Sequence, residues 1–358
     1  MTYKQIGKNN HITIDCDATL LDGLFKLNNM TNNLQISRLI IFVVDKKGSV
    51  IGSLTDGDIR RDLVINKDLN KKVSEICNKN FFYLNDDCEQ FNLSKFRKKN
   101  IKILPVLDSK KKIIELIDLE NVKAVLPLEC MIMAGGRGKR LSPLTDKTPK
   151  PLIKLGNKPI IEHNIDKLKS FGIKKFYISI KYLGEQIVEY FGDGSSKGIE
   201  IEYIIEDEPL GTAGSLSKIK KIKTENILIT NSDLFTDINI EDMYLNLINN
   251  QANMAIASKE YIINVPYGIF ESDNFNVKSL IEKPTYKYNL NAGVYILNKK
   301  LINKVPKNKY FDITQLIEKL LEQNKKVIHF PILGYWIDIG KPEDLKMAER
   351  LYKHSKEK

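Results

Sequence analysis

Cysteine and histidine are scarce in this sequence, and long apolar runs are absent. The four cysteines, Cys16, Cys77, Cys88 and Cys130, stand at wide spacings without a C-x-x-C pair or a nearby pair of the four histidines. This pattern excludes the usual zinc sites and disulfide scaffolds. No uncharged stretch reaches the roughly 18 residues of a membrane span, and no apolar segment typical of a signal peptide appears. We therefore expect a reduced, cytoplasmic protein that does not act at a membrane.

The positive charge lacks the clustering typical of proteins that bind nucleic acid. The formal net charge is +11, but the 56 lysines and arginines are scattered among 45 acidic residues. A nucleic-acid surface needs a basic patch interleaved with aromatic side chains, and none is evident. We therefore expect no nucleic-acid partner. Anionic phosphate ligands and a lysine-rich surface remain consistent with the charge.

An internal repeat occupies the first third of the chain. Residues 41–58 (IFVVDKKGSVIGSLTDGD) and residues 104–121 (LPVLDSKKKIIELIDLEN) share an apolar run, an Asp, a charged turn and a second apolar run, at an offset of 63. One such small unit cannot bury its own sheet face, so the two copies should pack into one domain. With 358 residues, the chain is long enough for two domains. We expect them at residues 1–125 and 126–358.

The two copies resemble paired CBS modules, an α+β fold. In the first copy, this resemblance implies that Thr55 and Asp58 contact the ribose and phosphate of an adenine nucleotide. The second copy departs from the pattern, with Asp118 and Asn121 at the equivalent positions. Two interpretations of the pair stay open: nucleotide sensing, or dimerisation and stability. We expect a homo-oligomer.

From residue 126 onward, strand patterns alternate with helix patterns. Such alternation predicts an α/β fold, here a Rossmann-like, mixed but mostly parallel sheet with helices on both faces, whose ligands sit beyond the carboxyl ends of the strands. The expected strands are residues 132–134, 176–180, 199–206 and 227–231, and the expected helices are residues 159–171, 184–191 and 212–219.

The first loop of this region, residues 134–152 (AGGRGKRLSPLTDKTPKPL), is rich in glycine and basic residues. It fits neither the G-x-G-x-x-G dinucleotide pattern nor the P-loop, since Arg140 stands where the P-loop has Ser or Thr. Glycines let backbone amides approach an anion closely, and Arg140 and Lys150 add positive charge. The loop therefore predicts a triphosphate cradle.

The same loop resembles the signature of the sugar-1-phosphate nucleotidyltransferases, and the resemblance extends over the whole second half. The matching segments occur in the family's order: 135–141 (GGRGKRL), 150–152 (KPL), 156–160 (GNKPI), 209–214 (PLGTAG), 231–233 (NSD), 267–268 (YG), 281–284 (IEKP), 291–295 (NAGVY) and 336–342 (WIDIGKP). The resemblance implies Mg²⁺-dependent transfer of a nucleotidyl group to a sugar 1-phosphate, giving a nucleotide sugar and pyrophosphate. Positioning and charge neutralisation suffice for such an in-line displacement, without a covalent enzyme intermediate.

The resemblance also assigns catalytic roles. Arg140 and Lys150 would hold the triphosphate, Lys283 would hold the sugar phosphate, and Asp233 and Asp338 would be the magnesium ligands. Taken alone, an Asp after a strand, as Asp233 is, favours a helix N-cap over a metal ligand, and the surrounding motifs reverse that preference.

The resemblance implies a second group of contacts to the base and the sugar. Glu206 could accept hydrogen bonds from guanine, which favours GTP, although a solvated strand-end charge is an equal alternative. The remaining nucleotide contacts would come from Ala134, Gly135, Gly136, Gly138, Gly211 and Thr212. The sugar contacts would come from Tyr267, Gly268, Glu282 and Asn291.

The domain order narrows the resemblance further. A CBS pair ahead of this catalytic domain is similar to bacterial glucosamine-1-phosphate guanylyltransferases that supply legionaminic acid synthesis for surface glycans. UTP, dTTP and CTP remain alternative donors. A catalytically silent regulatory or assembly subunit that senses nucleotides is an alternative of a different class, against which the retained basic and acidic residues argue.

Overall fold

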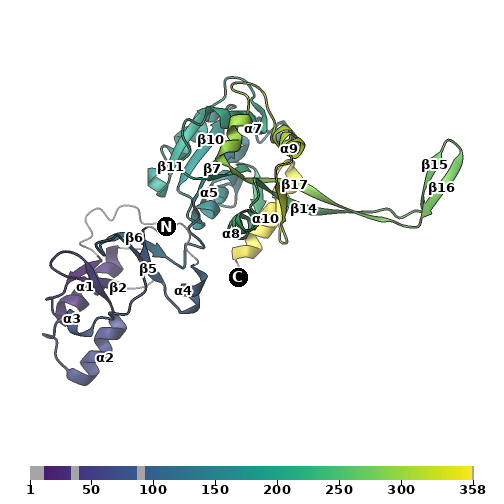
Figure 1. Ribbon diagram of the computed structural model, residues 1–358. Coiled ribbons are helices and arrows are strands. Elements are labelled where there is room, and N and C mark those ends of the chain that lie inside the picture. Colours follow the sequence, from purple (N-terminus) through teal and green to yellow (C-terminus); the bar gives the residue numbers. More distant parts are fainter. Residues whose placement is uncertain (1–11, 34–39, 87–92, 357–358) are drawn as a thin grey trace. The chain divides into compact units, whose positions relative to one another are not determined.

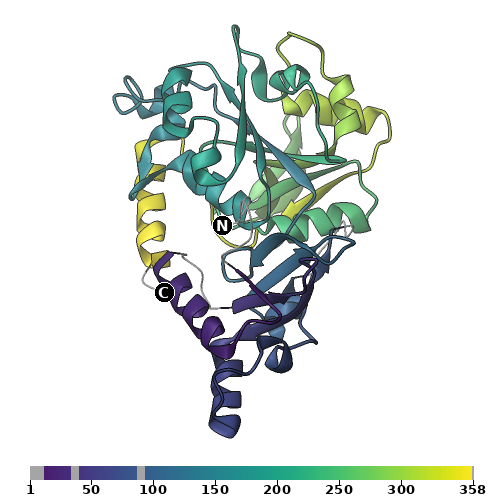
Figure 2. The ribbon, with the colours of Figure 1, turned by 90° about the vertical axis from the view of Figure 1, so that its left-hand side faces the viewer.

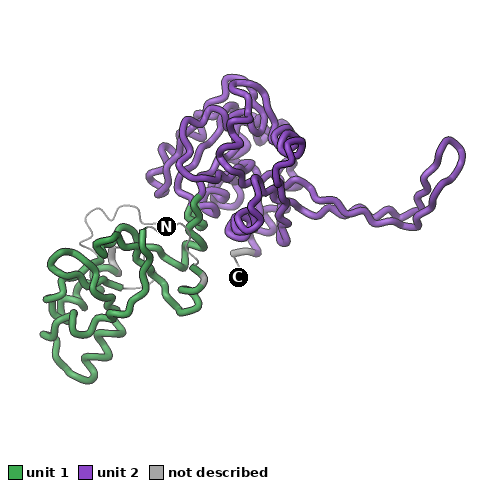
Figure 3. The backbone as a smooth tube through the Cα atoms, viewed as in Figure 1, with its two compact units in different colours: residues 1–127, 169–172 green, residues 128–168, 173–358 purple. Residues whose placement is uncertain are grey.

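The computed structural model describes residues 12–33, 40–86 and 93–356, which form two compact units (Figure 3). Unit 1 comprises residues 1–127 and 169–172, and unit 2 comprises residues 128–168 and 173–358. The short segment 169–172 belongs to unit 1 because the carbonyl groups of Ser170 and Phe171 accept hydrogen bonds from the N–H groups of Lys123 and Leu126. Within the described ranges, none of the helices combines the length and apolar character needed to cross a bilayer.

Unit 1 contains two three-stranded sheets, in the orders β1-β2-β3 and β4-β5-β6. In each sheet the first two strands are parallel and the last two antiparallel. Its elements are β1 (Thr13–Asp15), α1 (Leu20–Asn33), β2 (Ile40–Val44), β3 (Val50–Thr55), α2 (Asp56–Asn66), α3 (Val73–Ile76), β4 (Leu84–Asn85), α4 (Ser94–Lys98), β5 (Ile103–Leu107) and β6 (Ile113–Asp118).

The two sheets repeat one another residue by residue at the offset of 63 that the sequence shows. Ile40 pairs with Thr55, and Ile103 pairs with Asp118. The register shifts at Val43 in one hairpin and at Val106 in the other. One core cluster contains β2 and β3 residues together with Ile103, Leu107 and Ile113, so both copies bury their sheet faces in a shared core.

Unit 2 is built on a seven-stranded sheet in the order β11-β10-β7-β12-β17-β14-β18. The four strands β11, β10, β7 and β12 are mutually parallel, β17 is antiparallel to both neighbours, and β18 is parallel to β14. Figures 1 and 2 show the sheet from two directions, with α7 and α9 over one face and α5 and α8 over the other. This confirms the predicted mixed, mostly parallel α/β fold.

The strands of unit 2 are β7 (Leu128–Met133), β8 (Lys154–Leu155), β9 (Lys158–Pro159), β10 (Lys175–Ile180), β11 (Glu200–Ile205), β12 (Asn226–Asn231), β13 (Leu234–Thr236), β14 (Met254–Asn264), β15 (Ile269–Asp273), β16 (Asn276–Ile281), β17 (Thr285–Asn298), β18 (Val327–Pro331) and β19 (Trp336–Asp338). The helices are α5 (Ile160–Ser170), α6 (Gly184–Phe191), α7 (Gly211–Gly214), α8 (Ile240–Asn249), α9 (Ile313–Glu322) and α10 (Pro342–Lys356), with short 3-10 turns η1 (Lys139–Leu141), η2 (Lys150–Leu152), η3 (Ser195–Lys197), η4 (Ser215–Lys218) and η5 (Lys299–Lys304).

Buried apolar residues on alternate positions of the central strands form the core on one sheet face. Met131, Tyr177 and Ile229 from three adjacent strands join Leu316 and Leu320 of α9 in one cluster. Because side chains alternate between the faces of a strand, the residues between them point to the opposite face. A sheet covered on both faces explains why β7, β10 and β12 are almost continuously apolar.

The prediction of one continuous α-helix over residues 212–219 is wrong. The structure has the four-residue α7 followed by the 3-10 turn η4. The carbonyl of Phe311 accepts the N–H groups of Ala213 and Gly214, and the carbonyl of Leu210 accepts the N–H group of Phe311. The Phe311 carbonyl thus binds two first-turn N–H groups, which the predicted helix would leave without an internal partner.

An extended two-stranded ribbon leaves the sheet of unit 2 (Figures 1 and 3). Beyond the sheet, β14 and β17 continue to pair from Ser258 opposite Asn291 to Asn264 opposite Thr285. The hairpin β15–β16 forms the far end. We refer to residues 259–290 as the arm.

Candidate functional site

A cavity of about 710 Å³ opens beyond the carboxyl ends of parallel strands in unit 2. The loops after β7, β10, β11 and β12 all contribute to it, as expected for a fold of this class. Its lining includes Gly135, Gly136, Gly138, Arg140, Lys150, Glu206, Gly211, Thr212 and Asp233 of the predicted nucleotide site. Ala134 is buried at the end of β7 and does not line the cavity.

The glycine loop after β7 turns sharply so that Lys150 can approach. Gly138 has a φ of +65°, and a Cβ atom there would lie 2.9 Å from the Cβ of Lys150. Only glycine accepts both the left-handed conformation and this close approach. The hydroxyl of Thr145 donates to the carbonyl of Gly138 at 2.9 Å, which holds the turn.

Lys150 lies between the two predicted metal ligands. Its ammonium group forms an ion pair with Asp233 and approaches Oδ1 of Asp338 at 3.9 Å. Strands β13 and β19 produce this convergence, because they pair Leu234 with Asp338 across 104 residues of sequence. The N–H of Ile339 also donates to the carbonyl of Asp233 at 3.0 Å. The structure therefore brings together three side chains that lie far apart in the sequence.

The surroundings of these two carboxylates suit a hard cation. Oδ1 of Asp233 is buried and has no hydrogen-bond partner among the described residues. Burial raises the pKa of Asp338, the negative charge of Asp233 raises it further, and Lys150 and Arg140 oppose the shift. Two carboxylates with one unsatisfied oxygen are what Mg²⁺ commonly uses beside substrate phosphates, so the residues fit the ion.

Arg140 reaches the same region from the glycine loop. A Cβ atom on Gly340, two residues after Asp338, would lie 3.2 Å from Nη2 of Arg140, so the guanidinium lies directly against this glycine. Arg140 and Lys150 thus place two positive charges at one end of the cavity, next to the carboxylates.

Glu206 also lines the cavity, close to Gly135 at the start of the glycine loop, and is held by two donors. Its carboxylate accepts hydrogen bonds from the hydroxyl of Ser179 and, at 3.1 Å, from the N–H of Leu210. The side chain is 9% exposed, and Oε1 lies 3.6 Å from where a Cβ atom on Gly135 would be. The alternative of a solvated strand-end charge is wrong, because the carboxylate is buried.

Several residues that line the cavity were not predicted from the sequence as site residues. Lys181 and Tyr182 follow β10 directly, so the rule that places ligands after strands could have identified them. Tyr310 and Asp312 come from the segment before α9. Oδ1 of Asp312 accepts from the N–H and the hydroxyl of Thr212, at 3.0 and 3.2 Å. The hydroxyl of Thr212 is therefore already engaged within the protein.

The residues predicted for the sugar do not meet at this cavity. Tyr267, Gly268, Glu282 and Lys283 lie on the arm, and Asn291 lies at its base, opposite Ser258. Among the described residues that line the cavity, none belongs to the arm. Tyr267 is 74% exposed, and the backbone of Lys283 has a φ of +45°.

Unit 1 has a cavity of its own, of about 770 Å³, lined by both copies of the repeat. Thr55 and Asp58 line it, and they also form the capping box that starts α2. The hydroxyl of Thr55 donates to Oδ2 of Asp58 at 2.7 Å, and Arg61 pairs with Oδ1 at 2.6 Å. Lys102 comes from the second copy.

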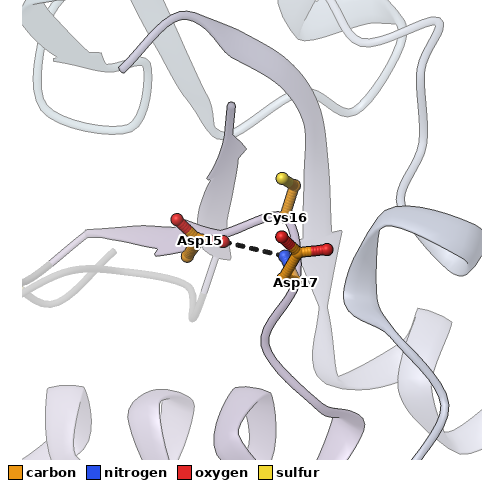
Figure 4. Close-up of side chains that lie close together, drawn as sticks. All are labelled: Asp15, Cys16 and Asp17. Atoms are coloured by element: carbon orange, nitrogen blue, oxygen red, sulfur yellow. Dashed lines mark hydrogen bonds between the residues drawn. The ribbon is translucent and has the colours of Figure 1, made fainter. Parts of the chain in front are cut away.

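A cluster of Asp15, Cys16 and Asp17 in unit 1 has three potential metal ligands (Figure 4). The backbone N–H of Asp17 donates to Oδ1 of Asp15 at 2.8 Å, and Lys72 pairs with Asp17 at 2.7 Å. Burial raises the pKa of the Cys16 thiol, and the neighbouring aspartates raise it further. Local turn geometry and the Lys72 ion pair account for the cluster without a metal.

Sequence comparison finds relatives of unit 2 among nucleotide-sugar enzymes. The chain is 34% identical over 230 residues to D-glycero-alpha-D-manno-heptose 1-phosphate guanylyltransferase of Aneurinibacillus thermoaerophilus. This match covers 63% of this chain and 99% of that protein. It is 31% identical over 231 residues to mannose-1-phosphate guanyltransferase of Debaryomyces hansenii and 32% identical over 229 residues to the catalytic subunit beta of the Drosophila melanogaster enzyme. These matches cover 62% of this chain and only 64% and 62% of those two proteins.

Solved structures are similar over the same share of the chain. HddC from Yersinia pseudotuberculosis, solved with GMP-PN, is 28% identical with a TM-score of 0.50, and the match covers 63% of this chain and 99% of HddC. A putative glucose-1-phosphate thymidylyltransferase from Bacillus anthracis is 23% identical with a TM-score of 0.51, and the match covers 63% of this chain and 94% of that one. The second likeness supports the fold alone.

Two family models match the sequence. Residues 4–65 match the CBS domain. The second match spans residues 129–355, more than half of the chain and all but the last few residues of unit 2. This chain therefore belongs to the nucleotidyl transferase family and carries an N-terminal CBS domain.

Proposed function

We propose that unit 2 transfers GMP from GTP to a sugar 1-phosphate, releasing pyrophosphate. The observation that carries the proposal is the convergence of Lys150 and Asp233, which line the cavity, with Asp338, which lies 3.9 Å from the Lys150 ammonium. The guanylyltransferase names of the relatives and the GMP-PN complex of HddC support guanine as the base. The proposed reaction needs a triphosphate cradle, a cation site and a place for the acceptor phosphate.

Charge neutralisation by fixed groups is the chemistry that this site offers. The backbone amides of the glycine loop, Arg140 and Lys150 would bind the triphosphate and stabilise the charge that grows on the α-phosphate during attack. The sugar phosphate oxygen would form the new P–O bond while the bond to pyrophosphate breaks on the opposite side. The described cavity residues require no covalent intermediate for this displacement.

Asp233 and Asp338 are the residues that would hold Mg²⁺, as their geometry permits. When bound, the ion would neutralise phosphate charge that the two cations cannot cover alone. With the ion present, the ammonium of Lys150 would turn from the carboxylates to the phosphates. The ion pair with Asp233 thus keeps Lys150 in place before substrate arrives.

Glu206 is the residue proposed to select guanine. Each oxygen of its buried carboxylate accepts one protein hydrogen bond, from Ser179 or from Leu210, and each retains a second lone pair. The N1–H and N2–H groups of guanine could use these positions. Uracil and thymine offer no such pair of donors, so they would leave the second lone pair of each carboxylate oxygen without a hydrogen bond from the base.

The sugar is the least constrained part of the proposal. The domain order favours glucosamine 1-phosphate and a role in legionaminic acid synthesis, whereas the relatives act on mannose and heptose phosphates by their names. Pyrophosphate release should therefore be measured with GTP, UTP, dTTP and CTP against the 1-phosphates of glucosamine, mannose, glucose and heptose. Turnover with UTP or CTP alone would refute guanine, and no turnover with any pair would leave the silent regulatory subunit as the better reading.

The cavity of unit 1 supports a second proposal, that the CBS pair binds an adenine nucleotide. Thr55 and Asp58 would face the ribose, while Arg60, Arg61 and Lys102 supply positive charge for its phosphates. Isothermal titration of the full chain with AMP and ATP should show a site that Asp58→Ala weakens and Asp233→Asn leaves intact. Heat signals that are equal in the wild type and Asp58→Ala would favour a purely structural role in dimerisation.

A further inference from the structure

The arm exposes large apolar and aromatic side chains along most of its length. Eleven large apolar or aromatic side chains between residues 259 and 290 are exposed, and Phe275 at the tip is fully so. Beyond Ser258, β14 no longer pairs with β18, so within the described chain both outer edges of the ribbon are open. A two-stranded ribbon is marginal in water, and exposed apolar edges invite pairing with another chain.

The arm cannot readily fold back onto the core from which it emerges. Seven consecutive residue pairs connect β14 and β17 from Ser258 opposite Asn291 to Asn264 opposite Thr285. Neither strand contains glycine or proline over this stretch. At about 3.4 Å per residue, the continuous ladder carries the tip roughly 20 Å outward before the first irregularity, near Pro266 and Pro284. For the tip to reach its own cavity, this ladder would have to break or the ribbon would have to bend at the irregularity between Ile256 and Ser258.

The arm carries groups that the cavity lacks. Gly268, which follows Tyr267, lies close to Glu282, since a Cβ atom on Gly268 would lie 2.8 Å from Oε2 of Glu282. Lys283, beside them, adopts a left-handed backbone conformation, which costs a non-glycine residue about 1 kcal/mol or more. Strained residues of this kind often mark ligand sites, yet neither of the two cavities described above is lined by them.

We infer that two copies of this chain exchange their arms, so that Lys283 and the Tyr267–Glu282 corner of one copy complete the sugar-phosphate side of the other copy's cavity. This inference rests on the proposed function for the chemistry of Lys283, but not for the exchange itself. A reciprocal exchange is a closed arrangement that buries both arms at once. It also explains why the cavity described within one chain has a nucleotide half without its acceptor half.

Complementation between two inactive variants tests the shared site. Asp233→Asn damages the core, and Lys283→Ala damages the arm. In exchanged dimers formed by coexpressing both variants, one site of each mixed dimer pairs an intact core with an intact arm. Random assembly should therefore restore about a quarter of the wild-type pyrophosphate release, because half the dimers are mixed and one of their two sites is whole. Activity that stays at the level of the separate variants, or normal turnover by Lys283→Ala alone, would overturn the inference.

A photocrosslink tests the exchange without relying on catalysis. The full chain would carry p-benzoylphenylalanine in place of Phe275 or, as a control, in place of Leu333, which is 92% exposed but lies outside the arm. Irradiation should yield a species of doubled mass from position 275 and not from position 333, with the crosslinked peptide in unit 2 of the other copy. Crosslinks confined to one chain would overturn the exchange. Crosslinking without any nucleotidyl transfer would instead fault the proposed function.

Discussion

Replacing Lys150 with methionine should destabilise unit 2 strongly. The Lys150 and Asp233 side chains are only 11% and 20% exposed, so the substitution leaves the Asp233 charge largely buried without its partner. Breaking a buried ion pair costs about 3–5 kcal/mol. The contact to Asp338 at 3.9 Å adds about 1 kcal/mol or less, because Asp338 is 45% exposed and water screens it. We expect a loss of about 3–5 kcal/mol in the free energy of unfolding.

The chain's single tryptophan provides the assay. Trp336 lies in β19, two residues before Asp338, so its fluorescence during urea unfolding reports on unit 2. The double variant Lys150→Met/Asp233→Asn should be more stable than Lys150→Met alone, because it removes the stranded charge. Mg²⁺ should stabilise Lys150→Met more than the wild type. A loss below about 1 kcal/mol for Lys150→Met, or strictly additive effects in the cycle, would refute the reasoning.

Three further predictions follow from the same contacts. Asp233→Asn should abolish Mg²⁺-dependent turnover while the Trp336 emission spectrum remains native; near-normal turnover would remove Asp233 from the cation site. Glu206→Ala should lower kcat/KM for GTP at least about tenfold, because the two hydrogen bonds from guanine to the carboxylate are lost. The same variant should leave UTP turnover unchanged, and an equal loss for both nucleotides would contradict base selection by Glu206. Although burial pushes the pKa of Glu162 upward, hydrogen bonds, chiefly from Lys197, hold it below its usual 4.5. Glu162→Gln should therefore cost about 1–3 kcal/mol at pH 7, and the difference should be lost as the pH falls through the lowered pKa of the wild-type carboxyl, which then becomes protonated. A pH-independent difference in urea unfolding would contradict this.

Some parts of the site that the sequence predicted follow a strand directly. The glycine loop, Glu206 and Asp233 each come within a few residues of the end of a buried strand, and parallel strands place their carboxyl ends at one edge of the sheet. The local pattern of apolar residues also predicted α6 with its observed bounds. Local patterns are enough to predict such residues, because the parallel sheet brings the ends of its strands together.

The parts that sequence could not supply depend on distant segments. Thr212 meets Asp312 across 100 residues, and no local pattern signals that the carbonyl of Phe311 would accept the first N–H groups of α7. The arm shows a different limit. Alternating apolar residues predict strands, but they do not reveal whether the outer edge of a strand pairs within the chain or remains open.

The most direct test of the account follows the oxygen atoms of the reaction. A sugar 1-phosphate labelled with ¹⁸O in its phosphate group would be incubated with GTP, Mg²⁺ and the full chain, and the products would be analysed by mass spectrometry. Attack of the sugar phosphate on the α-phosphorus predicts a GDP-sugar that carries all of the label and pyrophosphate that carries none. Label in the pyrophosphate, or no GDP-sugar from GTP with any sugar 1-phosphate, would contradict the proposed transfer.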